Sequence, residues 1–476
     1  MKAISLVLFY LFVTNLGAQE IWTLSSCVDY ANKNNLGLQQ SKISVEEANL
    51  SLLESRQKQL PDLNGAIGGG LSFGRNVDPT SNSFTTENIF SSNYSLTTGV
   101  ALYQGGAIRN SIKQNKLNLD AKKQDYQQAS NDLALSIASN YLNVLLCQER
   151  LEMALKNTGL VQGQLNQMQK MIQAGLKPEA DALEMKSQLA HMDQAQLIAE
   201  NNLDLAWLDL KQAMRLDPRK PLQIEKLTED QLNEIQINND NLNEIQINND
   251  NLDQLAESAI QSQASMKAAY SRLEAARIGE KISKSLYYPN LFLSGSIGSR
   301  YSDAAIRISE YETQRIAIPG FYVNGVALNV EQDIQVPKST VVIPFKDQYE
   351  QFLGYGIGFN LNIPIYNQRS SKTAVQKAKL ATRSSETQVE LQKEKINRDV
   401  YQAYASAKAS KKEFDAALRA YDATKYAHDK TQKRFDLGTA SVFDLNQSQS
   451  NLQNAESSWL IAKYNLVFSQ KVLDYY

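Results

Sequence analysis

Cysteine and histidine are scarce in this sequence, which holds two of each in 476 residues. So few of these side chains cannot build a disulfide scaffold or a cluster of zinc ligands. Cys27 and Cys147 could still pair in an oxidising compartment, but two lone buried thiols on separate helices is the interpretation we favour. We expect no metal site and no cofactor.

An excess of basic residues is also missing, because 49 Lys and Arg stand against 51 Asp and Glu and give a net charge of −2. Recognition of phosphates usually needs a clear basic excess, so nucleic acid is excluded as the main partner. Beyond the N-terminus no run of 18 apolar residues occurs. This excludes a helical protein that crosses a membrane several times.

Residues 1–18 have the pattern of a secretory signal peptide. Lys2 precedes an apolar run at 4–13, and small residues at 17 and 18 precede Gln19. A buried N-terminal helix is the alternative. Cys27 lies too far from the apolar run for lipoprotein processing. The sequence thus predicts export of the chain.

The sequence contains an internal duplication. An offset of 404 − 141 = 263 aligns identical residues of the two halves: Tyr141 with Tyr404, Gly175 with Gly438, Asp181 with Asp444, and Leu189 with Leu452. Upstream, Pro61 aligns with Pro289 at an offset of 289 − 61 = 228. The difference, 263 − 228 = 35, predicts an insertion of that size in the second half.

We therefore divide the chain into a first repeat at 19–214, a linker at 215–250 and a second repeat at 251–476. The linker carries a tandem decapeptide, LNEIQINNDN at 232–241 and again at 242–251, which is typical of a tolerant surface segment. The insertion falls within 302–349 and is interpreted as an extracellular loop. Whether it is a variable loop, a cap on a pore or a phage receptor stays open.

Four segments alternate between apolar and small or polar residues, as β-strands do. They lie at 63–74, 93–102, 291–301 and 353–365, and the last is the clearest, with apolar residues at every odd position. Strands of about 10 residues with a Gly, Ser and Asn face fit the lumen of an outer-membrane barrel. A soluble sandwich is the alternative. In lipid, four strands cannot close a barrel alone, so other copies must supply the rest.

Two segments without proline, at 107–174 and 370–437, predict helices on the order of 100 Å long. Apolar residues recur three and four apart in the first (Leu133, Ile137, Tyr141, Val144, then Leu165, Met168, Ile172), and alanines form the stripe of the second (Ala403, Ala407, Ala416, Ala420). Gly175 and Gly438 suit left-handed caps that end these helices, and Pro178 and Ser441 suit the start of returning helices. Each half therefore predicts a helical hairpin.

Taken in order, these features resemble those of TolC-like outer-membrane channel proteins over essentially the whole mature chain. The resemblance rests on the doubled helix–hairpin–helix plan, the signal peptide, the segment WTLSSCV at 22–28, the prolines before strands, and two Gly-x-x-x-x-x-Asp tips. It implies a mixed α+β membrane protein. Three chains of four strands each would form a twelve-stranded barrel, continued by a long α-helical barrel across the periplasm.

The resemblance also implies a passive exit duct in the outer membrane that does no chemistry. An inner-membrane transporter and a periplasmic adaptor would dock at the hairpin tips. Matching the family's tips residue by residue gives candidates for adaptor contact and for the periplasmic gate: Gly175, Leu176, Asp181, Gly438, Thr439, Asp444 and Leu445. Glu184 joins them because it lies three residues after Asp181 and shares its side of the helix.

The tip acids carry a second interpretation. Asp181 and Asp444 both follow a predicted helix start, where carboxylates cap the helix or complement its dipole. Gln447, one turn after Asp444, departs from the doubled acidic ring of the family.

Two other classes of protein compete with the duct. One is a soluble periplasmic coiled-coil scaffold, which the Gly, Ser and Asn strand face argues against. The other is an enzyme, but His191 and His428 lie in predicted helices without a recognisable nucleophile motif, and the glycines at 68–70 belong to a strand. The cargo, whether small molecules or proteins, stays open.

Overall fold

The computed structural model describes residues 21–77, 82, 84–86, 88–226 and 249–476. The described residues form two compact units: a helical unit within 21–49, 116–226, 249–275 and 382–476, and a sheet unit within 50–77, 82, 84–86, 88–115 and 276–381. Each unit takes matching segments from both halves of the duplication. The expected signal peptide at 1–18 and residues 232–248 of the decapeptide tandem lie outside the described residues.

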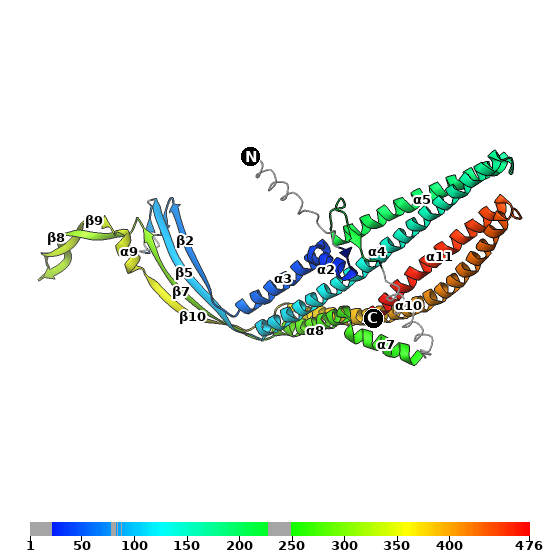
Figure 1. Cartoon of the computed structure of the whole chain (residues 1–476). Coiled ribbons are helices and arrows are strands. Elements are labelled where there is room, and N and C mark those ends of the chain that lie inside the picture. Colours follow the sequence, from blue (N-terminus) through cyan, green and yellow to red (C-terminus); the bar gives the residue numbers. More distant parts are fainter. Residues whose placement is uncertain (1–20, 78–81, 83, 87, 227–248) are drawn as a thin grey trace, which may run out of the picture. The chain divides into compact units, whose positions relative to one another are not determined.

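The duplication is visible in the bounds of the long helices. Helices α4 (Ala107–Gln173) and α10 (Ser370–Asp436) each have 67 residues and start 370 − 107 = 263 positions apart. The returning helices α5 (Glu179–Met214) and α11 (Val442–Tyr475) start 442 − 179 = 263 positions apart. The offset read from the sequence is therefore confirmed, and so are both helical hairpins (Figure 1).

The upstream offset is confirmed in the same way. Helices α3 (Leu36–Gln57) and α8 (Ala264–Ser285) each have 22 residues and start 264 − 36 = 228 positions apart. Strands β2 (Asp62–Ser72) and β7 (Asn290–Ser302) start 290 − 62 = 228 positions apart. Helices α2 (Leu24–Asn34) and α7 (Asn249–Ser262) precede them.

The apolar stripe of α4 lies in the core of the helical unit, as its spacing predicted. Ile137, Tyr141 and Val144 are buried in a cluster that also holds residues of α2, α5 and α11. Both cysteines belong to this cluster, and Cys27 and Cys147 are buried free thiols.

The predicted burial of the alanine stripe of α10 is confirmed for two of its four residues. Ala403 and Ala407 are buried, but Ala416 and Ala420 are exposed. Phe414 is the buried residue of this stretch, where it packs against Ala462 and Leu466 of α11. A phenylalanine in a helix–helix contact outweighs nearby alanines because it buries far more apolar area.

A small parallel sheet joins the start of the described chain to the linker. Strand β1 (Ile21–Trp22) pairs with β6 (Gln223–Ile224). The hydroxyl of Tyr141 donates to the carbonyl oxygen of Glu225 at 2.7 Å. Burial and nearby negative charge raise the pKa of Tyr141 to about 12, so the hydroxyl remains a donor at neutral pH.

Four strands form the main sheet of the sheet unit, in the order β10-β7-β5-β2 and antiparallel throughout (Figure 1). The remaining members are β5 (Ile89–Gln104) and β10 (Gly354–Asn362). The central pair, β5 with β7, joins the two halves of the duplication. The four predicted strands are confirmed.

One β-bulge changes the predicted pattern of β5. The register of β5 against β7 shifts between Ala101 and Tyr103, so Tyr103, and not Leu102, pairs with Leu291. A bulge places one extra residue in a strand and shifts the alternation of side chains beyond it.

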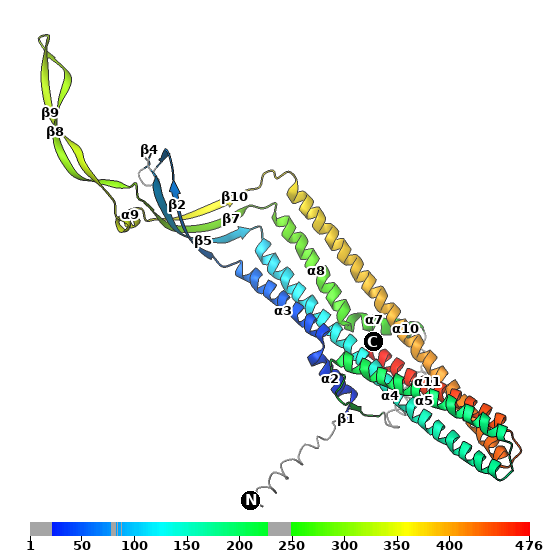
Figure 2. The same cartoon turned by 90° about the horizontal axis from the view of Figure 1, so that it is seen from above.

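The insertion at 302–349, which we expect to be an extracellular loop, consists largely of regular secondary structure. It forms a two-stranded ribbon, β8 (Ile306–Val323) with β9 (Val326–Val342), followed by the short helix α9 (Phe345–Gln351) (Figure 2). Asn324 and Gly325 connect the strands with φ of 52° and 80°. An Asn-Gly pair at positive φ is the preferred two-residue hairpin turn, a signal that the sequence analysis overlooked. Strands β3 (Asn76–Val77) and β4 (Phe84–Thr85) pair with each other.

Candidate functional sites: the two sheet faces and the hairpin tips

One face of the four-stranded sheet is lined by large apolar side chains. The register aligns them across neighbouring strands: Leu63, Ile67 and Leu71 of β2, Tyr94, Leu96 and Val100 of β5, Leu291, Leu293 and Ile297 of β7, and Tyr355, Ile357, Phe359 and Leu361 of β10. In the single chain most of this face is open, and Ile357 is 82% exposed. A contiguous apolar surface of this kind needs a membrane or a partner.

The opposite face carries small or uncharged polar side chains over most of its length. Its members are Asn64, Gly68 and Gly70 of β2, Asn93, Ser95 and Thr97 of β5, Ser294, Ser296 and Gly298 of β7, and Gly356, Gly358 and Asn360 of β10. Phe292, which pairs with Ala101 and Asn360, is an exception. Small polar side chains leave room for water and solutes beside the sheet.

The sheet is open at both edges. Within the described residues, β2 and β10 are its outer strands, and each has one neighbour. An open edge presents unpaired N–H and C=O groups, which lipid cannot satisfy. An apolar face and open edges together mean that the sheet of a single chain is incomplete.

The first hairpin tip ends α4 with a Schellman motif. Gly175 has φ of 73°, and its N–H donates to the carbonyl of Ile172 at 2.8 Å. The N–H of Leu176 donates to the carbonyl of Met171 at 2.9 Å. These two bonds satisfy carbonyls that the helix end leaves free, and the positive φ favours glycine.

The second tip repeats this geometry. Gly438 has φ of 76°, and its N–H donates to the carbonyl of Phe435 at 2.9 Å. The N–H of Thr439 donates to the carbonyl of Arg434 at 2.8 Å. The predicted left-handed caps at Gly175 and Gly438 are confirmed, and the two tips share one backbone design.

Asp444 caps the helix that follows its tip. Its carboxylate accepts the N–H of Ser441 at 3.0 Å and the hydroxyl of Ser441 at 2.8 Å. In return the N–H of Asp444 donates to the Ser441 hydroxyl oxygen at 3.1 Å, which completes a capping box. The hydrogen bonds from Ser441 hold the pKa of Asp444 below its ordinary value of 3.8. Two roles were predicted for Asp444, helix capping and gating, and the structure shows helix capping.

The first tip has no equivalent box. Pro178 is the N-cap residue of α5 and makes no side-chain capping bond. Asp181 is half-buried in the first turn, and Glu184 is exposed one turn later. Carboxylates in the first turn of a helix complement its dipole. The first turn of α5 holds two such carboxylates, Glu179 and Asp181.

The two tips pack together through an apolar cluster in the helical unit. Its buried members come from both hairpins: Leu165, Met168, Ala182, Met185, Val442 and Leu445. The ammonium of Lys177 lies 5.8 Å from the ring centre of Phe435, which also joins the tips.

Leu445 does not fit its proposed place in the contact surface. Its side chain is 0% exposed, because the cluster of both hairpins encloses it. The exposed large apolar residues of the tips include Leu176, which was predicted, and Leu183, Leu437 and Phe443, which were not. Leu445 is buried and Phe443, two residues earlier, is exposed because of the way the four helices of the hairpins pack.

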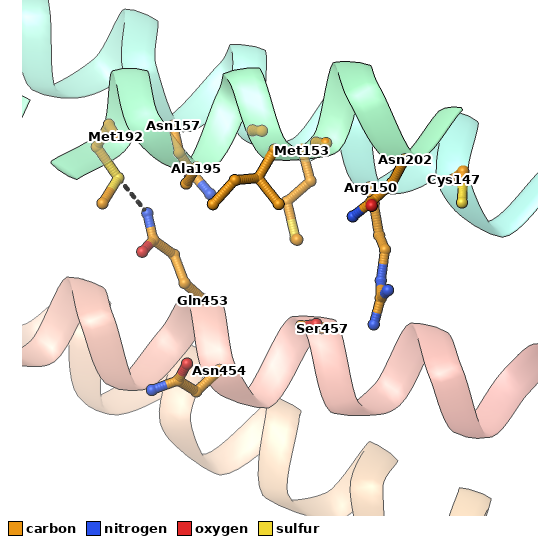
Figure 3. Close-up of a pocket in the computed structure, with 13 residues that line it drawn as sticks. Cys147, Arg150, Met153, Asn157, Met192, Ala195, Asn202, Gln453, Asn454 and Ser457 are labelled. Carbon is orange, nitrogen blue, oxygen red and sulfur yellow. Dashed lines mark hydrogen bonds between the residues drawn. The ribbon is translucent and has the colours of Figure 1, made fainter. Parts of the chain in front are cut away.

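A cavity of about 280 Å³ lies between α4, α5 and α11 (Figure 3). Methionine, alanine and amide side chains make up most of its lining, and Nε2 of Gln453 donates to Sδ of Met192 at 2.8 Å. Cys147 lies at its edge, and burial raises the pKa of this thiol, which keeps it protonated and weakly nucleophilic. Among the described residues that line the cavity, the charged one is Arg150.

The structure brings His428 next to a serine. Nδ1 of His428 lies 3.1 Å from Oγ of Ser448. The Ser448 hydroxyl also lies 2.9 Å from the carbonyl oxygen of Leu445. The His428–Ser448 pair joins α10 to α11.

No helix among the described residues combines the length and the apolar character that crossing a bilayer requires. Nor does that part of the chain contain a group of three or more His, Cys, Asp or Glu side chains that could hold a metal ion.

Comparison with known families gives one match that covers most of the chain. The model of the outer membrane efflux protein family matches residues 28–214 and 255–474. Among characterised proteins, the chain is similar to the outer membrane protein TolC of Vibrio cholerae serotype O1. The two are 21% identical over 457 residues, which cover 94% of this chain and 89% of that protein.

Solved structures show the same fold. The protein CusC, whose crystal structures concern folding and transmembrane channel formation, aligns with a TM-score of 0.72 at 14% identity, and the alignment covers 94% of this chain and 90% of that chain. The outer membrane protein VceC of Vibrio cholerae gives 0.71 at 13% identity, with 94% of both chains covered. The Campylobacter jejuni outer membrane channel CmeC gives 0.72 at 16% identity, with 95% and 84% covered.

Proposed function

The chain belongs to the outer membrane efflux protein family, and on that premise we propose that it is the passive exit duct of a tripartite export system. The observation that carries the proposal is the four-stranded sheet. One face is apolar and exposed, the other is small and polar, and both edges are open. Such a sheet fits a wall between lipid and water that other copies must complete.

Three is the smallest number of copies that leaves an open duct. Two chains of four strands would give an eight-stranded barrel, whose interior is just wide enough for side chains to fill. Three chains give twelve strands, with β10 of each copy beside β2 of the next. The glycine, serine and asparagine side chains of the polar face would then line the lumen.

The helical hairpins would extend the duct into the periplasm, with their tips at its inner end. There they would receive a periplasmic adaptor and, through it, an inner-membrane transporter. The surface that we assign to the adaptor contains Gly175, Leu176, Gly438 and Thr439, together with exposed Phe443. Leu445 supports this surface from below. The transporter supplies the energy, so the duct needs no catalytic residues and no cofactor.

Membrane extraction and particle mass test the proposal. We expect the protein to remain in the membrane fraction after carbonate treatment, to form three-fold particles in detergent by electron microscopy, and to conduct ions in planar bilayers. Release by carbonate, or a monomer in detergent, would overturn the duct and leave a soluble scaffold of helical hairpins as the function.

A further inference from the structure

Helix α9 covers one end of the apolar sheet face. The rings of Phe345 and Tyr349 stack at 6.0 Å, and both lie over Tyr94, at 5.8 Å and 6.1 Å between ring centres. Phe345 also lies 5.5 Å from Tyr301 of β7. Tyr94 and Tyr301 point to the same face as the apolar residues of their strands. Helix α9 therefore lies on the face that we assign to lipid, where the ribbon leaves the sheet (Figure 2).

Gln348 holds α9 in this place. Its side chain is fully buried, and its Nε2 donates to the carbonyls of Ser302 at 2.8 Å and of Ile343 at 2.7 Å. Its Oε1 accepts the N–H of Ser302 at 2.9 Å. One amide side chain thus satisfies backbone groups at the end of β7 and fixes the helix against the strand.

The exposed side of α9 is amphipathic. Phe345 and Tyr349 remain 48% and 40% exposed although they belong to an aromatic cluster. Lys346, Asp347 and Glu350 are exposed beside them. Half-exposed aromatic rings beside charged groups are typical of the boundary between lipid chains and headgroups.

The position of α9 along the strands matches that boundary. On β7, Tyr301 lies 301 − 291 = 10 residues from Leu291, the partner of Tyr103. Ten residues at about 3.3 Å each, tilted by about 40°, span roughly 25 Å, which is the height of the apolar band of outer-membrane barrels. Exposed tyrosines occur near the other end as well, at 103, 287, 288 and 366. Two aromatic belts thus bound the band, and α9 belongs to the belt on the ribbon side.

We propose that α9 is an interfacial helix that binds the headgroup region of the outer leaflet. Phe345 and Tyr349 insert at the boundary, and the charged residues of α9 face the headgroups. The helix fixes the depth of the barrel in the membrane and keeps the ribbon in water beyond it. This inference rests on the proposed function, because it requires the apolar sheet face to lie in lipid.

Tryptophan substitutions test the depth of each position. Phe345→Trp and Tyr349→Trp variants are reconstituted in phosphatidylcholine vesicles whose lipids carry bromine either near the headgroup or near the chain ends. Because Trp22, Trp207 and Trp459 stay in every variant, the signal is the difference from the unsubstituted protein. We expect a loss of tryptophan emission that is largest with bromine near the headgroup.

Two matched variants distinguish an error in the barrel from an error in the placement of α9. Ile357→Trp lies in mid-band, since its partner Gly295 is 295 − 291 = 4 residues from Leu291, and it should be quenched by bromine near the chain ends. Tyr311→Trp in the ribbon should respond to aqueous iodide alone. If Ile357→Trp is not quenched by lipid, the barrel itself is wrong. If it is quenched while both α9 variants respond only to iodide, the barrel stands and the interfacial helix is refuted.

A further variant tests the attachment of α9. Gln348→Ala, which removes the side chain that fixes the helix, is introduced into the Phe345→Trp protein and into the Ile357→Trp protein. We expect quenching by headgroup bromine to fall in the Phe345→Trp protein and quenching by chain-end bromine to stay unchanged in the Ile357→Trp protein. Trimer bands on a mild-detergent gel show that each variant assembles. Unchanged quenching in an assembled Gln348→Ala variant would contradict the anchoring of α9 by Gln348.

Discussion

At the scale of single residues, hydrogen bonds satisfy the backbone groups of the two helix ends at each hairpin tip. The second tip does so with a capping box between Ser441 and Asp444. The first tip starts its returning helix with Pro178 and no side-chain bond. The two tips share their glycine caps but differ in how firmly the returning helix begins.

Replacing Ser441 with alanine should loosen the second tip. Loss of an N-cap serine costs about 1 kcal/mol, so amide hydrogen exchange at Asp444 should become roughly fivefold faster. The exposed Ser187 on α5 is the control, because Ser187→Ala replaces a surface serine with a better helix former and should not speed exchange there. Equal effects of both substitutions would contradict the capping role.

Acid should act on the same box. The pKa of Asp444 lies below its ordinary value, so folding favours its ionised form. The stabilisation is complete above the ordinary value of 3.8 and is lost as the pH falls through the lower folded-state pKa. The box is therefore intact at any neutral periplasmic pH, and Asp444 does not act as a pH sensor.

The two cysteines should be inert in the folded protein. Burial raises the pKa of Cys27 from 9.0 to about 11 and also raises that of Cys147. Because the thiolate is the reactive form, we expect no reaction with a disulfide reagent at pH 8 in the native state and two thiols per chain after denaturation without reductant. Fewer than two thiols would show that an oxidised form exists.

At the scale of elements, the sheet gives the sharpest test of which face meets lipid. Ile357 and Asn360 lie on β10 and point to opposite faces. A lysine at the bilayer midplane of a barrel costs about 2–4 kcal/mol, so Ile357→Lys should reduce insertion and trimer yield. Asn360→Lys should assemble normally and shift the ion selectivity of the channel toward anions. The opposite result in a fractionation and bilayer experiment would mean that the faces are reversed.

Elements with a local signal could be predicted from the sequence. The long helices follow from the absence of proline, the tips from Gly175 and Gly438, and the four strands from their alternation. The duplication gave both offsets because matching helices kept their lengths. In these cases the residues that specify an element lie within it.

Features that depend on contacts between distant segments could not be predicted. Leu445 and Phe443 are both apolar residues of one tip, but the cluster formed by both hairpins buries Leu445 and leaves Phe443 exposed. The aromatic cluster of α9 joins Tyr94 to Tyr349, which are 349 − 94 = 255 residues apart. The β8–β9 ribbon was different, because its Asn324-Gly325 turn was a local signal that could have been read.

At the scale of the whole molecule, three-fold assembly would repeat every exposed side chain three times around one axis. Each edge strand would acquire a neighbour, β10 beside β2, so the barrel would have no open edge. The same symmetry would bring three copies of each tip around one axis. A side chain with a small effect in one chain would then form a ring at the inner end of the duct.

Such a ring should govern the selectivity of the channel for ions. Asp181 and Glu184 lie outside any capping box, and three copies would place six carboxylates around the axis. Rings of Asp and Glu favour cations in channels. The double substitution Asp181→Asn with Glu184→Gln should therefore reduce the preference for cations and raise single-channel conductance in planar bilayers, if the carboxylates narrow the opening.

Asp444→Asn is the matched control. Because the Asp444 carboxylate is already held by Ser441, this substitution should loosen the tip with a smaller change in ion selectivity. Unchanged selectivity in the double variant would place the first tip away from the solute path and leave its acids the role of complementing the helix dipole.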